Sequence, residues 1–415
     1  MIVAASRFAP LPGCALPAEG SVTFPMGFRG AGVHAGLKRS RRDVGILVSE
    51  LPAVSAAFFT RNGAAAAPVR LTRDEGATGA LQAVVVNSGN ANACTGPQGD
   101  ADARTMRDLA AELLALPAPQ VAVSSTGVIG LPLPMDVIEK GIGKAAAKLA
   151  DDGGEDFAAA IRTTDRSEKQ GALSVAVKGG EVRLGFAAKG AGMISPNMAT
   201  TLCFVTCDAA VSAADWYAMT AAAVGASFNR ITVDGQESTN DMVLALANGA
   251  SGIRLADSDL ERLAEALQAG LLAMALAVVG DGEGATTTVH LRVDGALDDG
   301  EAERVARAVA GSPLVKTAVY GRDANWGRIV QSAGMALSPN GCGPLSCDVA
   351  FDGVALLRDG VPLALSEAQE AALAEALAAA ELDLSVDLHR GAASSHVYFS
   401  DLTHDYVRIN AGART

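Results

Sequence analysis

The sequence predicts a mixed α+β fold, and three kinds of local pattern support this prediction. Short apolar runs such as Ala83–Val86 and Leu202–Val205 indicate buried strands. The pair Gly179-Gly180 between two apolar runs is typical of a hairpin turn. Stretches with Leu and Ala at helical spacing, such as residues 258–275, indicate helices. Strands joined by hairpins and interrupted by helices favour packed α and β layers, although periodicity alone does not give their topology.

The expected elements follow the apolar patterns in chain order. Strands are predicted at residues 83–86, 121–125, 173–177, 182–186, 202–205, 286–293 and 382–388. Helices are predicted at residues 105–116, 216–225, 258–275 and 366–380. Two of these helices show capping-box spacing, at Ser258-x-x-Glu261 and Ser366-x-x-Gln369. Because a second helix-and-strand region follows, we expect a catalytic region over residues 1–284 and a C-terminal domain over residues 285–415.

Charge and composition exclude several classes of partner. The net charge of −13, from 33 basic and 46 acidic residues, argues against nucleic acid or an anionic membrane surface. No run reaches the roughly 20 apolar residues of a membrane span, and the first twenty residues do not resemble a signal peptide. The cysteines and histidines are dispersed without ligand spacing. We therefore expect a cytoplasmic protein without a metal or a disulfide framework.

The most informative segment is Lys189–Val205, where a glycine-rich loop leads into an apolar strand. Gly190 and Gly192 permit backbone conformations that other residues avoid, and a strained loop can hold a peptide bond in a reactive geometry. We hypothesise that Thr200 attacks the carbonyl of Ala199 and becomes a new N-terminus. Its free α-amino group would then serve as general base for its own hydroxyl. A threonine entering a strand is more often structural, so local spacing alone does not decide between the two.

A set of segments distributed along the chain supports the nucleophile hypothesis. Gly192–Thr200 resembles the self-cleavage site of the ornithine acetyltransferase (glutamate N-acetyltransferase) family of arginine biosynthesis. Further segments resemble this family in the same order: Asn87–Gly96, Ser125–Gly130, Ser227–Gly235, Asp281–Thr286, Asn325–Arg328 and Asp401–Ala411. Because these segments span nearly the whole chain, the resemblance is far more specific than one short motif.

The resemblance implies both a fold and an activity. The fold would be a four-layer αββα sandwich, like that of N-terminal nucleophile hydrolases but with different connectivity, and a separate C-terminal domain. After self-cleavage, Thr200 would take acetyl from N2-acetyl-L-ornithine and pass it to L-glutamate by a ping-pong mechanism. No cofactor is implied, and some members also accept acetyl-CoA as donor. The resemblance further implies an α2β2 assembly of self-cleaved chains.

The resemblance also assigns roles to individual residues. Thr126 and Gly127 match the family's oxyanion hole, although by local pattern alone Ser125–Gly127 is more simply a turn. The positions that match substrate-binding residues are Thr163 (favoured over Thr164), Lys189, Thr200, Glu283, Asn410 and Thr415. A lysine suits the substrate α-carboxylate, and a glutamate suits an amino group. The matches near the C-terminus imply that the tail returns to the active site.

Some positions depart from the usual family pattern and leave the substrate preference open. Gln236 and Glu237 follow Asp234-Gly235, where another Asp and a small residue or Met are common, and Thr287 replaces a common Lys. One alternative is a paralogue on the same scaffold that acts as an amidase or aminopeptidase, or that uses another acyl donor or acceptor. A second alternative is an uncleaved relative with a structural role, against which the intact site positions argue.

Overall fold

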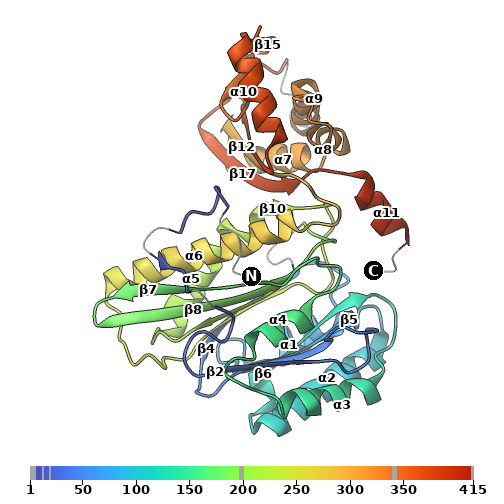
Figure 1. The fold of residues 1–415 in the computed structure, drawn as a ribbon, viewed down its shortest axis with the longest axis vertical. Helices are drawn as coiled ribbons and strands as arrows, with labels where there is room; N and C mark the ends of the chain where they lie inside the picture. Colours follow the sequence, from blue (N-terminus) through green and yellow to red (C-terminus); the bar gives the residue numbers. More distant parts are fainter. Residues whose placement is uncertain (1–5, 12–13, 18–19, 196–200, 339–343, 413–415) are drawn as a thin grey trace.

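The computed structural model describes residues 6–11, 14–17, 20–195, 201–338 and 344–412 (Figure 1). A four-stranded sheet has the order β2 (Phe28–Val33), β3 (Val44–Ser49), β5 (Ala83–Asn90) and β6 (Val121–Val128). One face of this sheet is covered by α1 (Ala67–Glu75), α2 (Gly96–Leu114) and α3 (Met135–Ala146). Met106 of α2 and Ile138 of α3 pack with Val85 of β5 in the core beneath these helices.

A six-stranded sheet forms the second β layer. Its order is β1 (Cys14–Ala15), β7 (Lys169–Val177), β8 (Gly180–Lys189), β9 (Leu202–Cys207), β11 (Met242–Ala247) and β4 (Val54–Phe59). Its outer face is covered by α5 (Ala213–Ala226) and α6 (Asp257–Gly280). The expected hairpin is confirmed, because β7 and β8 pair antiparallel across Gly179-Gly180.

The two sheets face each other across a common apolar core. Leu47 and Val84 of the four-stranded sheet belong to the same buried cluster as Phe204 and Leu244 of the six-stranded sheet. Helix α4 (Gly154–Ile161) adds Phe157, whose ring meets Phe204 edge-on at 5.2 Å between centroids. The layers are therefore helix, sheet, sheet, helix, which confirms the predicted αββα sandwich.

A third sheet carries the C-terminal elements, which lie above the sandwich in Figure 1. Its strands, in order, are β10 (Ile231–Thr232), β17 (Ala393–Ser400), β12 (Thr288–Ala296), β16 (Glu381–Asp387), β13 (Asp348–Phe351), β14 (Val354–Arg358) and β15 (Val361–Pro362). The helices of this region are α7 (Asp299–Ala310), α8 (Pro313–Tyr320), α9 (Trp326–Leu337), α10 (Glu367–Ala378) and α11 (His404–Gly412). Because β10 comes from the sandwich region of the sequence, it ties this sheet to the first 284 residues.

Several expected boundaries differ from those observed. The helix predicted at 105–116 begins earlier, at Gly96, where a glycine and a proline hide its first turn from a periodicity test. The capping box predicted at Ser258 is wrong, because α6 already begins at Asp257 and Asp259 caps the Ala256 N–H. The capping box at Ser366 and Gln369 is confirmed. Short 3₁₀ turns occur at Ala118–Gln120 and Phe228–Arg230.

Helix α6 corrects the expectation that no segment approaches the length and hydropathy of a membrane span. Over Asp257–Gly280 it is long and apolar enough by length and composition. Most of its apolar residues are buried against β7 and β8, and Gly270 lets the ring of Phe186 approach the helix backbone closely. The helix thus has the contacts of a core helix.

Candidate active site

A cavity of about 160 Å³ opens where strand ends of both sandwich sheets meet the C-terminal helix α11. Every described residue predicted for the site lines it: Thr126, Gly127, Thr163, Lys189, Glu283 and Asn410. These residues come from β6, the loop after α4, the end of β8, the turn after α6 and α11. Residues up to 284 positions apart in the sequence therefore share one small cavity.

The predicted scissile pair Ala199-Thr200 and the predicted tail residue Thr415 lie outside the described residues. The described residue that follows the pair is Thr201, which has φ +83° although it is β-branched. Thr201 and Lys189 line a second, adjoining cavity of about 20 Å³. Since Lys189 also pairs with Leu202 across β8 and β9, the strand after Thr200 begins beside the pocket lysine.

Lys189 places a buried ammonium group in the pocket. The residue is only 8% exposed, and its Nζ donates a hydrogen bond to Thr126 Oγ1 at 3.2 Å. Burial lowers the pKa of Lys189, although the nearby carboxylate of Asp165 opposes this change. The pocket therefore offers a poorly hydrated cation, which is suited to binding a carboxylate.

Gly127 is the next-to-last residue of β6 and has a conformation that a side chain would prevent. Its φ is +134°, and a Cβ atom there would lie 2.3 Å from the carbonyl carbon of Gly89. Ser125–Gly127, which by local pattern suggested a turn, is part of this strand. Asn240 connects the strand to the segment after β5 by donating hydrogen bonds to the carbonyl oxygens of Ser125 and Ala91, at 2.9 and 2.6 Å. The peptide at Thr126-Gly127 is thus held rigidly beside Lys189, as preorganised oxyanion stabilisation requires.

Glu283 and Asn410 both line the cavity and contact each other. Asn410 Nδ2 donates to Glu283 Oε2 at 2.8 Å, so α11 contacts the turn after α6. The Glu283 N–H donates to the carbonyl oxygen of Ala191 at 2.8 Å. A Cβ atom on Gly192 would lie 2.6 Å from Glu283 Oε2, so glycine leaves the space that this carboxylate occupies.

A Gly192→Ala variant is expected to fold normally and to bind substrate about tenfold more weakly. The added methyl group displaces only the end of a flexible side chain, but that end is the Glu283 carboxylate. The check is a comparison of Tm and KM with a Gly143→Ala variant, since no atom lies within 4 Å of a Cβ at Gly143. An unchanged KM in Gly192→Ala would show that the Glu283 carboxylate does not bind the substrate.

Sequence reasoning missed several polar residues that line or support the cavity. Asp234 accepts hydrogen bonds from the N–H groups of Met193 and Ile194 at 2.7 and 2.9 Å, and burial raises its pKa. Asp241 accepts from the Thr201 N–H at 2.6 Å, and burial raises its pKa to about 7. The polar run 238–241 directly before an apolar strand was a signal that could have located Asp241.

Two of the residues that depart from the family pattern, Gln236 and Thr287, line different cavities. Gln236 lines the cavity that contains the predicted site residues, together with Tyr406 of α11. Thr287 lies in a separate cavity. The Gln236 departure therefore bears on substrate preference more directly than the Thr287 departure.

The one group of potential metal ligands found among the described residues lies elsewhere. Asp348, Asp359 and His389 bring one ligand atom each within 4.8 Å of one another on the C-terminal sheet. The three residues are partly or fully exposed, and none of them lines the catalytic cavity. Acyl transfer by a threonine with its own amine needs no metal.

Comparison with known proteins assigns the chain to a family. Two relatives named arginine biosynthesis bifunctional protein ArgJ are similar over most of their length. The protein from Symbiobacterium thermophilum is 48% identical over 95% of this chain and 99% of its own. The protein from Nitratidesulfovibrio vulgaris is 46% identical over 94% of this chain and 99% of its own.

Two solved structures match part of the chain. A chain of the ArgJ structure from Bacillus halodurans is 48% identical, covers 45% of this chain and 98% of its own, and has a TM-score of 0.43. A chain of ornithine acetyltransferase from Mycobacterium tuberculosis, solved with ornithine, is 42% identical, covers 45% of this chain and 100% of its own, and has a TM-score of 0.42. The model of the ArgJ family matches residues 29–415. With nearly the whole sequence matched by that model and by relatives of similar length, this chain belongs to the ArgJ family.

Proposed function

We propose that this protein cleaves itself between Ala199 and Thr200 and then transfers acetyl from N2-acetyl-L-ornithine to L-glutamate. Family membership supports the reaction class. The observation that carries the residue assignments is the meeting of Thr126, Lys189 and Glu283 with Asn410 in one cavity. These groups supply what acyl transfer between amino acids needs beside a nucleophile: hydrogen-bond donors, a cation and a carboxylate.

The first stage is self-cleavage. The Thr200 hydroxyl adds to the Ala199 carbonyl, the C–N bond breaks, and the acyl group moves from nitrogen to oxygen. The nitrogen takes the proton, and water hydrolyses the resulting ester to give residues 1–199 and 200–415. The new α-amino group has an ordinary pKa of about 7.7–8.0, which suits proton transfer near neutral pH.

The second stage is ping-pong acetyl transfer. The Thr200 hydroxyl attacks the acetyl carbonyl of acetylornithine and gives its proton to the Thr200 amine, which protonates the departing ornithine amine. Glutamate then enters the same cavity, and its amine attacks the acetyl carbonyl. The bond between this carbon and Thr200 Oγ breaks, and the proton lost by the glutamate amine passes through the Thr200 amine to Oγ, which restores the hydroxyl. Thr126 and Gly127 stabilise the oxyanion in both halves. One such donor is typically worth about 2.7–4 kcal/mol.

Substrate binding uses the opposed charges of the cavity. The Lys189 ammonium binds the α-carboxylate that both amino acids share. Glu283, held by Asn410, binds an amino group, and Thr163 adds to the binding surface. The family resemblance assigns Thr415 to substrate binding as well. Because each amino acid must leave before the other enters, the small cavity suits sequential occupation.

We further propose the remaining features that the family resemblance implies. Acetyl-CoA is a second donor, the self-cleaved chains assemble as α2β2, and the enzyme works in the cytoplasm. The catalytic region ends near residue 284, in the connection between α6 and β12. The C-terminal domain then contributes α11 to the site.

The deciding experiment follows a label on the acetyl group of acetylornithine in the presence of glutamate. We expect the label on glutamate, free ornithine in equal amount, and parallel double-reciprocal plots for the two substrates. Label recovered as free acetate would instead identify an amidase. Mixing the same enzyme with labelled acetyl-CoA tests the second donor separately.

A further inference from the structure

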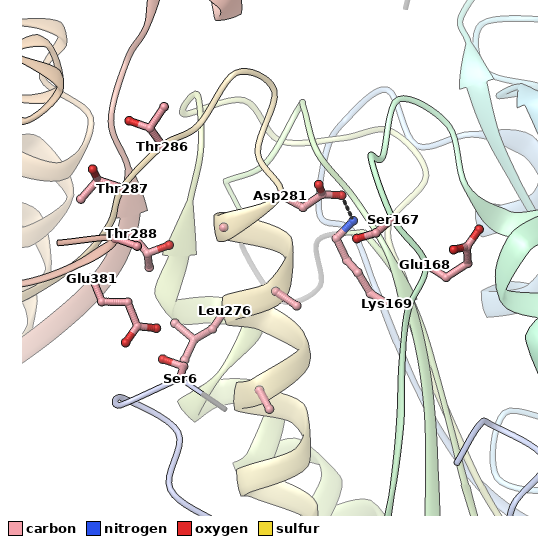
Figure 2. A pocket seen from close by; sticks show the side chains of 14 residues that line it. Ser6, Ser167, Glu168, Lys169, Leu276, Asp281, Thr286, Thr287, Thr288 and Glu381 are labelled. Atoms are coloured by element: carbon pink, nitrogen blue, oxygen red, sulfur yellow. Dashed lines mark hydrogen bonds and ion pairs between the residues drawn. The ribbon is translucent and has the colours of Figure 1, made fainter. Parts of the chain in front are cut away.

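Lys169 is a buried cation that does not line the catalytic cavity but pairs with carboxylates of two segments that support it. Its side chain is 2% exposed, and its Nζ lies 2.6 Å from Asp165 Oδ1 and 2.5 Å from Asp281 Oδ2. Lys169 and Asp281 line the separate cavity to which Thr287 belongs, which has a volume of about 350 Å³. Figure 2 shows these two residues at one side of it and Thr286–Thr288 at the other side. This cavity shares no lining residue with the catalytic cavity, so Lys169 does not touch the substrate there.

Asp165 accepts hydrogen bonds from two segments that form the catalytic cavity. Its Oδ2 accepts the N–H of Thr163 at 2.9 Å, and its Oδ1 accepts the N–H of Gly190 at 2.7 Å. Thr163 lines the catalytic cavity, and Gly190 directly follows Lys189. The carboxylate thus joins the loop after α4 to the end of β8.

Asp281 supports the segment of the cavity that carries Glu283. It begins the turn that places Glu283 in the catalytic cavity. Besides Lys169, it accepts hydrogen bonds from the backbone N–H and Nε of Arg166, at 3.0 and 2.9 Å. Asp281 would therefore keep a cationic partner if the charge of Lys169 were removed. For Asp165, Lys189 would then be the cation with the largest effect, while Lys38 and Arg162 also act on this carboxylate.

Two lysines make the largest contributions to keeping Asp165 charged. Although burial opposes ionisation, Lys169 and Lys189 hold the pKa of Asp165 below its usual range. Lys169 makes the direct ion pair, while Lys189 Nζ is hydrogen-bonded to Thr126 instead. A buried carboxylate that loses its partner is left as an uncompensated charge, and it attracts the cations that remain nearby.

We propose that Lys169 is a positioning residue for acetyl transfer, because by pairing with Asp165 it leaves the Lys189 ammonium free to face the catalytic cavity. The inference rests on the proposed role of Lys189 in binding the substrate carboxylate. Without the charge of Lys169, Lys189 turns to Asp165, and the carboxylate subsite is lost. The loops of Thr163 and Glu283 also lose their common tie.

The test compares KM and kcat for both amino acids across matched variants. Lys169→Met is expected to raise both KM values by roughly tenfold or more, while kcat changes by less than about threefold. Arg166→Met is the matched control. Arg166 binds the same Asp281, but its side chain is 59% exposed, so its removal is expected to raise KM less. Lys169→Arg keeps the charge and is expected to stay close to the wild type.

A second substitution separates positioning from simple packing. In Lys169→Met/Asp165→Asn the unpaired carboxylate is gone, so Lys189 returns to the pocket and KM falls part of the way back to the wild-type value. The recovery is incomplete because asparagine has one acceptor oxygen for the two N–H groups that Asp165 binds. A packing role predicts no such rescue. The inference is overturned by an unchanged KM in Lys169→Met, by a lowered Tm without a change in KM, or by a double variant no better than the single one.

The assay also distinguishes this inference from the proposed function. If the wild-type protein does not move acetyl from acetylornithine to glutamate, the proposed function fails. If the wild type is active and Lys169→Met keeps the wild-type KM, the inference about Lys169 alone fails. Should Lys169→Met not fold, Lys169→Gln takes its place, because it removes the charge but keeps a polar group beside Asp165. It is expected to raise both KM values, and an unchanged KM in a folded Lys169→Gln overturns the inference.

Discussion

A Thr200→Ala variant is expected to remain one chain of 415 residues and to lose acetyl transfer by roughly 10³-fold or more. The substitution removes the hydroxyl that attacks Ala199, so no new N-terminus forms. The same hydroxyl is the acceptor of the acetyl group, so both stages stop together. Intact mass under denaturing conditions, followed by the labelled acetylornithine assay, checks both effects.

Two controls make this result specific. Thr200→Ser keeps a hydroxyl and is expected to cleave and to retain part of the activity. Thr317→Ala removes an exposed hydroxyl of α8 and is expected to behave as the wild type. A Thr200→Ala protein that still breaks at residue 199, or that transfers acetyl as one chain, contradicts the nucleophile assignment.

The second large effect is expected in Lys189→Met, which should raise KM for both substrates by roughly 10- to 150-fold. This range corresponds to the loss of one hydrogen bond to a charged group, about 1.5–3 kcal/mol. The physical reason is that methionine fills the same buried space without the ammonium that faces the cavity. Steady-state kinetics measure it, and Lys178→Met, at an exposed position of the β7–β8 turn, is the control.

The pH dependence of KM gives an independent reading of Lys189. Burial lowers the pKa of Lys189, so its ammonium loses the proton at a lower pH than a free lysine does. Binding of the carboxylate is therefore complete below this lowered pKa, and KM rises as the pH passes upward through it. The charged groups that act on Lys189 are Lys38, Asp165, Lys169, Asp241 and Glu283. In Lys189→Met this rise of KM with pH should be absent. A rise that persists in the variant would come from the titration of another group.

The sequence predicted much of the secondary structure where the local signal was strong. The hairpin around Gly179-Gly180 and the capping box at Ser366 depend on residues a few positions apart, and both are confirmed. The start of α2 at Gly96 was missed because its first turn has a composition that periodicity does not detect. Strand β10, only two residues long, gave no pattern at all and is defined by its partner β17.

By itself, the sequence determined the chemical groups available to the site: a threonine after a glycine-rich loop, a lysine, a glutamate and an asparagine near the C-terminus. Only the tertiary structure decided that Lys189, Glu283 and Asn410 share one cavity, and that Lys169 ties Asp165 to Asp281 behind it. The physical reason is distance along the chain. Periodicity and turn chemistry act over a few residues, whereas Lys169 meets Asp281, 112 positions away in the sequence, only when the packed layers bring the two segments together.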